Sequence, residues 1–244
     1  MHKIWLLLLL VPAFAGIAGA SALFDSGFNL QIAGPIGFDL TQSFNISVSA
    51  GPVVNPPKNI HVGNASASIT PIQANLGISP FLLSLNGGVS GNANKPDGHA
   101  EAETGGLSYT ILFRNILGSD FQNLTFRASG SALLLATADP GDSADASFGA
   151  SVFLVAADGT LLSLGSGNGV SAPPNSSLSL PLNFDIPTGP IPVNGTFSLV
   201  INGFAAGDAT ATPEVSTFSF TVAGMLCLAV WSFRRRRSAD QITR

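Results

Sequence analysis

The chain has a single cysteine, Cys227, and this residue lies inside an apolar stretch near the C-terminus. The roughly 190 residues before that stretch therefore contain no disulfide, no thiolate metal site and no cysteine nucleophile. Charged residues are also scarce, at 10% of the chain, whereas about a quarter is usual. The body of the chain must be held together by its apolar core alone, and its length permits such a core.

Basic residues are especially rare in the body. Between residues 21 and 213, four basic side chains are set against twelve carboxylates, so the formal charge there is −8, compared with −4 for the whole chain. Nucleic-acid binding needs a basic surface, so the composition argues against a nucleic-acid partner. An acidic body is compatible with solubility outside the cell and with cation-bridged contact to acidic polymers.

The apolar residues of the body have a period of two. Apolar and polar residues alternate in 44–49, 65–69 and 197–201, as in half-buried strands, and no stretch keeps helical spacing over three turns. Turn residues separate these segments. The pattern predicts an all-β domain, an antiparallel β-sandwich of jelly-roll or Greek-key type. A β-solenoid is the alternative, although no fixed repeat period is visible.

The boundaries of several elements follow from the same pattern. The Asp158-Gly159 pair between two apolar runs predicts a hairpin with a two-residue type I′ turn. Residues 51–58 and 165–177 are expected to be irregular loops, and 205–212 a small-residue linker. Further strands are expected at 28–32, 81–85, 107–113, 124–128, 132–137, 151–156, 160–164 and 178–182.

The N-terminal residues have the features of a secretory signal. His2 and Lys3 precede an apolar run over 4–11, and Ala18-Gly19-Ala20 fits an A-x-A cleavage pattern. We expect residues 1–20 to be a cleaved signal peptide and residues 21–204 to be an exported β-domain.

The C-terminal residues suggest a membrane segment. Residues 216–233 carry no charge and as a helix would span roughly 27 Å, close to the bilayer core of about 30 Å. Four arginines follow and would stop transfer, leaving the C-terminus in the cytoplasm and the body outside. These stop-transfer residues are Arg234, Arg235, Arg236 and Arg237. The expected fold class therefore includes one C-terminal transmembrane α-helix over 216–233. The alternative is a buried helix at the end of a soluble domain.

Together these features resemble a known sorting signal. The tail over 213–237, with Pro213, Glu214, Ser216 and Thr217, an apolar run and an arginine-rich end, resembles the PEP-CTERM sorting domain of Gram-negative bacteria that make extracellular polysaccharide. Val215 stands where that motif usually has a second proline.

The resemblance covers about the last thirty residues and implies sorting, not an activity for the body. It implies export across the inner membrane of a Gram-negative bacterium and anchoring in the membrane by the tail. An exosortase-like enzyme would then cut near the motif, and the protein would reach the cell surface or be secreted.

Two groups of polar residues are candidate sites in the body. On a strand, His99, Glu101 and Glu103 would share one face, which could bind a divalent metal or supply acid/base chemistry. The alternative is a solvated polar face. Asp139, Asp142 and Asp145 crowd a turn and are weak candidates for Ca²⁺, although the spacing is not that of an EF-hand and an ordinary acidic turn is the alternative. No cofactor is expected.

The sequence favours a non-enzymatic protein. We expect an exported structural or adhesive β-domain of the cell surface or extracellular matrix, with extracellular polysaccharide as a candidate partner. One alternative is a secreted hydrolase of matrix polysaccharide that uses Glu101 or Glu103. Another is an unprocessed single-pass membrane protein.

Overall fold

A computed structural model of the chain describes residues 21–50, 56–95, 97–121, 123–172 and 174–212, together with Met225. Residues Ala20–Ala211 form one compact unit. Its described residues form one 3-10 helix, η2 (Leu40–Gln42), and thirteen strands. The strands are β1 (Ser21–Ala33), β2 (Phe44–Ala50), β3 (Lys58–Val62), β4 (Ala65–Ile78), β5 (Phe81–Asn94), β6 (His99–Glu103), β7 (Leu107–Asn115), β8 (Thr125–Ala138), β9 (Ser143–Val155), β10 (Leu161–Ala172), β11 (Ser176–Pro181), β12 (Phe184–Pro187) and β13 (Thr196–Thr210).

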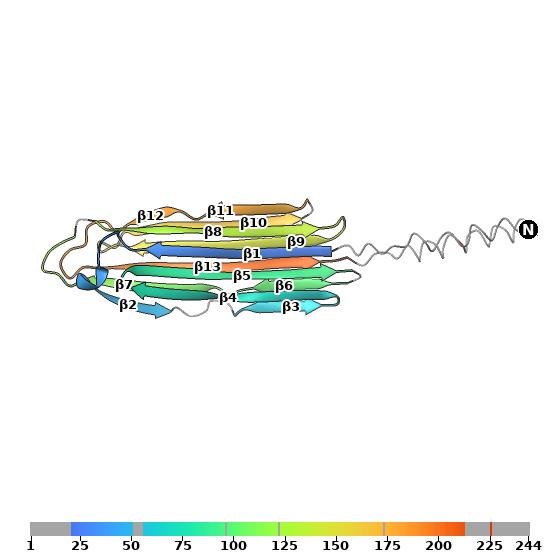
Figure 1. Cartoon of the computed structure of the whole chain (residues 1–244), viewed down its shortest axis with the longest axis horizontal. Coiled ribbons are helices and arrows are strands. Elements are labelled where there is room, and N and C mark those ends of the chain that lie inside the picture. Colours follow the sequence, from blue (N-terminus) through green and yellow to red (C-terminus); the bar gives the residue numbers. More distant parts are fainter. Residues whose placement is uncertain are drawn as a thin grey trace, which may run out of the picture. The chain divides into compact units, whose positions relative to one another are not determined.

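The strands form two antiparallel sheets (Figure 1). Sheet A has the order β11-β8-β1-β5-β4, and β12 pairs with β8 beyond the end of β11. Sheet B has the order β10-β9-β13-β6-β3, with β7 pairing to β13 beyond β6 and β2 pairing to β7. Among the described strands, only β4–β5 and β9–β10 are both consecutive and paired. The predicted all-β, antiparallel, sandwich-like body is confirmed.

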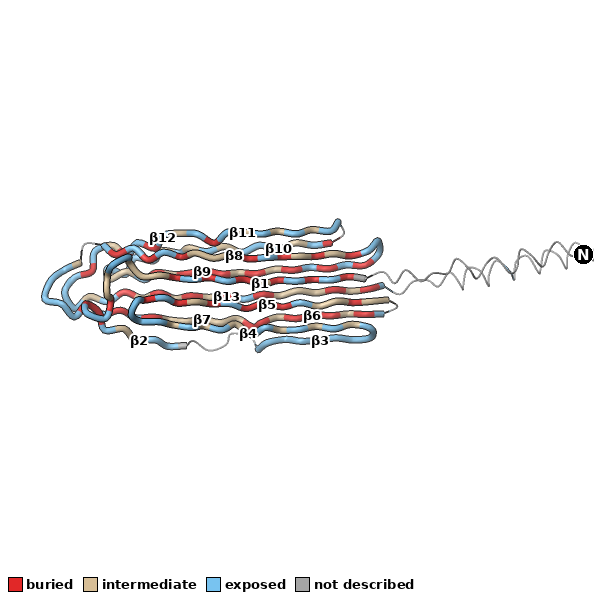
Figure 2. Tube along the Cα trace, in the orientation of Figure 1, coloured by how far each residue is buried: buried red, intermediate tan, exposed pale blue. Residues whose placement is uncertain are grey.

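Burial alternates along the strands, which is why a period of two was visible in the sequence (Figure 2). In β8, for example, Phe126 and Leu134 are fully buried, whereas Arg127 and Leu133 face solvent. Side chains from both sheets join in one apolar core. The edge strand β3 is exposed along its whole length.

The core has an aromatic end and an alanine end. Near η2 the phenylalanines pack together, and Phe113 of β7 stacks on Phe197 of β13 with ring centroids 4.5 Å apart and an interplanar angle of 3°. At the other end, where β1 begins and β13 ends, the buried side chains are mostly alanine, such as Ala22 and Ala209. Small side chains bring two sheets closer together, so the alanine end leaves little free space between them.

Glycines on the inner face of β13 make room for aromatic rings of sheet A. A Cβ atom at Gly207 of β13 would overlap the ring of Phe24, which projects from β1 in the opposite sheet. A Cβ at Gly203 would likewise lie 2.7 Å from Cζ of Phe28. The absence of a side chain at these glycines therefore leaves space that rings from sheet A fill.

The predicted hairpin at Asp158-Gly159 is confirmed, but the turn type is wrong. The Ala156 N–H donates to the Thr160 carbonyl (2.8 Å) and the Gly159 N–H to the Ala156 carbonyl (3.0 Å). A type I′ turn needs positive φ at both central residues. Only Gly159 has it (+83°), as in longer hairpin loops that end with a left-handed residue.

Three predicted boundaries are wrong because glycine and small residues continue strands. Segments 124–128 and 132–137 belong largely to one strand, β8, which passes through Gly130. Most of the predicted loop 165–177 is the second half of β10. Residues 205–210 of the predicted linker form the end of β13, paired on both sides with β6 and β9. Of the predicted loop 51–58, residues 51–55 lie outside the described part.

The predicted fold class, with its transmembrane helix over 216–233, has to be corrected. No helix among the described residues is long and apolar enough to cross a membrane. The 3-10 helix η2 has three residues, whereas a membrane span needs about 20. Except for Met225, the residues assigned to that helix lie outside the described part, as do residues 1–20 of the predicted signal peptide.

Candidate functional site

Strand β6 carries the first candidate group. Ala100 and Ala102 are buried, whereas His99, Glu101 and Glu103 are partly exposed on the outer face of sheet B, the face turned away from sheet A. The prediction that these three polar side chains share a strand face is confirmed. Alternate residues on one strand lie about 7 Å apart, so β6 alone does not bring the three together.

Neighbouring strands add two more carboxylates beside Glu101. Asp208 of β13 is paired directly with Glu101 on one side and with Asp145 of β9 on the other. Directly opposed side chains have Cβ atoms about 4.5–5.5 Å apart. We call Glu101, Asp208 and Asp145 the acidic row. The sequence did not reveal the row, because it exists only through pairing of segments far apart in the chain.

A lysine and a histidine lie beside the acidic row. The Lys58 Nζ lies 2.5 Å from Glu101 Oε1. His99 Nδ1 lies 3.6 Å from Asp208 Oδ2 and 3.1 Å from Thr210 Oγ1. The side chains of both pairs are partly exposed, and an exposed ion pair such as Lys58–Glu101 stabilises a protein little.

Asp208, the middle carboxylate, has a perturbed acidity. Partial burial raises its pKa above the usual value, and the nearby His99 and the hydrogen bond from Thr210 act in the opposite direction. The negative charges of Glu101 and Asp145 raise the pKa of Asp208 further. Protonation of Asp208 is therefore easier in the folded protein than in the unfolded chain.

The predicted calcium ligands do not converge. Asp142 follows the β8–β9 turn, where its N–H donates to the Asp139 carbonyl (2.9 Å), and its side chain is buried. Asp145 faces solvent in the acidic row. The aspartates separate because β9 begins at Ser143 and successive strand residues point to opposite faces. Among the described residues, no group of three or more His, Cys, Asp or Glu side chains is placed to hold a metal ion.

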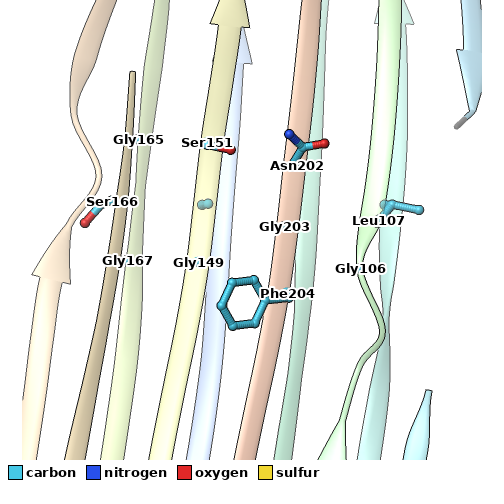
Figure 3. Close-up of a pocket in the computed structure, with 11 residues that line it drawn as sticks. Gly106, Leu107, Gly149, Ser151, Gly165, Ser166, Gly167, Asn202, Gly203 and Phe204 are labelled. Carbon is cyan, nitrogen blue, oxygen red and sulfur yellow. The ribbon is translucent and has the colours of Figure 1, made fainter. Parts of the chain in front are cut away.

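A shallow groove lies elsewhere on sheet B (Figure 3). We call it the Phe204 groove. It has a volume of about 560 Å³ and crosses strands β10, β9 and β13 to the start of β7. Neither Glu101 nor Glu103 contributes to it. Its lining residues are Gly106, Leu107, Gly149, Ala150, Ser151, Gly165, Ser166, Gly167, Asn202, Gly203 and Phe204.

The groove exists because glycines stand beside Phe204. Phe204 is paired with Gly149 of β9, which is paired in turn with Gly167 of β10. A Cβ atom at Gly149 would overlap the ring of Phe204, so the ring lies against the backbone of β9. Figure 3 shows the ring reaching from β13 toward β9. The side chain remains 40% exposed.

A break between β6 and β7 forms the other wall of the groove. The Thr104 N–H donates to the Ala205 carbonyl (2.9 Å), and the Ala205 N–H donates to Thr104 Oγ1 (2.9 Å). These two hydrogen bonds supply partners for the N–H and carbonyl groups of Ala205 in the gap between β6 and β7. Gly105 has φ +76°, a conformation that glycine readily accepts, and Gly106 then lines the groove.

The polar groups of the groove are uncharged. Ser151 and Asn202 are paired across β9 and β13, one row of residues away from Phe204. Ser166 lines the groove only through its backbone, because it is paired with the buried Ala150 and shares the inner face of sheet B. No lining residue is ionisable. Asp208 lies four residues beyond Phe204 on β13, about 13 Å away along the strand.

The predicted sorting and stop-transfer residues belong to another part of the chain. Both groups lie outside the described residues, so their roles stay predictions. The sorting residues are Pro213, Glu214, Val215, Ser216 and Thr217, and the stop-transfer residues are Arg234, Arg235, Arg236 and Arg237.

Comparison with protein-family models, with curated proteins and with solved structures finds no match for this chain.

Proposed function

We propose that the protein is exported and acts at the cell surface or in the extracellular matrix as a non-enzymatic structural or adhesive β-domain. Its sorting would depend on the PEP-CTERM-like residues Pro213 to Thr217 and on an exosortase-like enzyme. The proposal is supported by the surface chemistry of the sandwich and by the positions of the two ends relative to its strands.

The outer face of sheet A is the observation that carries this proposal. Gln73, Asn86, Asn29 and Ser131 are paired in one row across four strands. The next row is formed by Asn75, Ser84, Gln31 and Ser129. We call the surface formed by these two rows the amide face. Across strands β4, β5, β1 and β8, the described residues of the outer face include only two charged side chains, Asp25 and Arg127.

Amide and hydroxyl groups both donate and accept hydrogen bonds. A broad face of such groups can therefore make many weak contacts with a hydrated, hydroxyl-rich polymer. Because the face is nearly uncharged, those contacts would depend little on salt. This chemistry suits an extended matrix contact better than binding of one small substrate, since small-molecule sites are concave and mostly apolar.

The ends of the domain are compatible with processing at both termini. Strand β1 begins at Ser21, directly after the predicted cleavage pattern, and β13 ends at Thr210, before Pro213. Removal of residues 1–20 and of the segment after the motif would leave every described strand intact.

Fractionation of cells that produce the full chain tests the proposal. In a Gram-negative host with an exosortase, we expect the protein in the matrix and surface fractions. Glu214→Gln should reduce that fraction, whereas the matched change Asp240→Asn beyond the arginines should not. Protein that stays in the cytoplasm, or a Glu214→Gln variant that sorts normally, would contradict the sorting proposal.

The adhesive role needs a separate measurement on the exported protein. The paired change Asn29→Asp and Asn86→Asp places two carboxylates in the middle of the amide face. We expect this variant to reach the outside but to be retained in the matrix less than the wild type, because charged carboxylates cannot donate the hydrogen bonds that the amides donate. Asn45→Asp, a single exposed change on β2 of sheet B, is the control. Equal retention of the wild type, the double variant and the control in the matrix would contradict the adhesive role.

A further inference from the structure

We infer that the Phe204 groove is a binding site for a neutral carbohydrate, in which the apolar face of one sugar ring lies on the ring of Phe204. The inference deepens the proposed function, on which it rests, by naming the class of ligand and the site that takes it. The amide face of sheet A is a different surface and is not part of this site.

The Phe204 ring lies beside strand backbone that carries no side chains. Phe204 lies against the backbone at Gly149, and Gly167 follows in the same row of paired residues. The large side chain therefore sits beside two positions that carry no side chain. A flat ligand can contact the ring and the strand backbone together, because glycine allows close approach to the backbone.

Uncharged polar groups lie beside the ring. Ser151 and Asn202 supply one hydroxyl and one amide. These groups donate and accept hydrogen bonds without charge. A pyranose ring has an apolar face of C–H groups and a rim of hydroxyls, so it matches an aromatic floor with such a rim. The groove volume of about 560 Å³ lies within the usual range for ligand pockets, about 300–1,000 Å³.

The charge of the groove favours a neutral ligand. The groove contains no cation, and the acidic row begins four residues along β13 at Asp208. An anionic sugar in the groove would find no cationic partner for its carboxylate. The ligand is therefore a neutral glycan and not an acidic one. A second copy of the chain is disfavoured as occupant because the body carries a formal charge of −8.

Affinity electrophoresis of the exported protein provides the test, with soluble hydroxyethylcellulose as the neutral probe and polygalacturonate as the acidic probe. We expect retardation by hydroxyethylcellulose and none by polygalacturonate. Phe204→Ala should weaken the neutral interaction about tenfold, as expected for loss of one aromatic contact. Phe204→Trp should preserve or strengthen it.

A second variant tests the groove without changing Phe204. Gly167→Leu fills the groove while the ring stays in place, and the nearest atom to a Cβ at this position is 3.4 Å away. We expect it to abolish retardation. Leu133→Ala, at an exposed position on the outer face of sheet A, is the matched control and should bind normally. Circular dichroism of each variant separates loss of binding from loss of fold.

Several results would overturn the inference. These are no retardation of the wild type by the neutral polymer, stronger retardation by polygalacturonate, or wild-type binding by the Phe204→Ala and Gly167→Leu variants. Self-association that is lost in Phe204→Ala, measured by sedimentation, would assign the groove to a second copy instead. A protein that sorts to the surface but fails these tests would leave the proposed function standing and refute only the carbohydrate site.

Discussion

The ring of Phe24 in β1 occupies the space that a side chain on Gly207 in β13 would need, although the two residues belong to opposite sheets. Phe24 is fully buried, and Gly207 lies near the end of β13, the central strand of sheet B. The pair therefore sets how closely the sheets approach at the alanine end. This part of the fold depends on the absence of one side chain.

Gly207→Ala should destabilise the domain by roughly 1–3 kcal/mol, because the added methyl overpacks a filled interior. The measurement is the midpoint of urea unfolding. Gly169→Ala on the exposed edge strand β10 is the control, since a Cβ there meets nothing closer than 3.5 Å. It should be neutral or slightly stabilising, because alanine reduces the freedom of the unfolded chain. Equal midpoints for the two variants would contradict the packing argument.

The stacked pair Phe113 and Phe197 anchors the aromatic end. Phe197→Ala should cost about 3–5 kcal/mol, because it removes a fully buried ring and leaves a cavity among other phenylalanines. Leu112→Ala on the outer side of β7 should change stability by less than about 0.5 kcal/mol. Thermal and urea unfolding of both variants checks the difference, and a small loss for Phe197→Ala would disprove the stated role of the stack.

The acidic row predicts a specific pH dependence. Burial raises the pKa of Asp208 in the folded protein, so the carboxyl favours folding when protonated, and this contribution is lost as pH rises through the folded pKa. Asp208→Asn should therefore be indistinguishable from the wild type in acid and more stable at neutral pH. The gain should stay below about 1 kcal/mol because the side chain is 38% exposed.

Asp158 provides a control, because its pKa is shifted in the opposite direction to that of Asp208. Hydrogen bonds from Thr160 lower the pKa of Asp158, so its contribution to stability is present above the unfolded pKa and lost as pH falls through the folded pKa. Asp158→Asn should therefore reduce stability at neutral pH and not in acid. The measurement is urea unfolding of both variants between pH 3 and pH 8, roughly spanning the carboxyl range. Parallel profiles for the two variants would refute the assignment.

The short distance between the domain and the motif should limit processing. Ala211 is buried and its N–H donates to the Gly98 carbonyl (2.8 Å), so the chain is held against the domain only two residues before Pro213. Inserting Gly-Ser-Gly-Ser between Thr212 and Pro213 should speed conversion of the precursor, followed by immunoblot over time. The same insertion after Arg237 should have no effect. An unchanged rate with the first insertion would show that access is not limiting.

The sequence predicted the fold class of the body because burial alternates, and alternation is a local property. It failed where glycine and alanine fill strands. The run from Gly165 to Gly169 has the composition of a loop, yet it pairs with β9 along its length. Ala205 to Thr210 has the composition of a linker, yet it pairs on both sides. Pairing with other strands overrides weak strand propensity in such segments.

The candidate sites show the same limit. The shared face of His99 and Glu101 follows from positions two residues apart, and the sequence was sufficient to predict it. Asp208 and Phe204 were missed because their neighbours, Asp145 and Gly149 of β9, lie 63 and 55 residues earlier in the chain (208−145 and 204−149). The exposed position of Phe204 could have been found by continuing the alternation of Ser198, Val200 and Asn202 two residues further.

The intact mass of the exported protein tests the central claim most directly. The account predicts that protein recovered from the cell surface or medium of a Gram-negative host with an exosortase begins at or near Ser21. It should end near Pro213 and Glu214, so that it contains all thirteen described strands and little else. A recovered mass equal to that of the full 244-residue chain, or protein found only inside the cell, would contradict it.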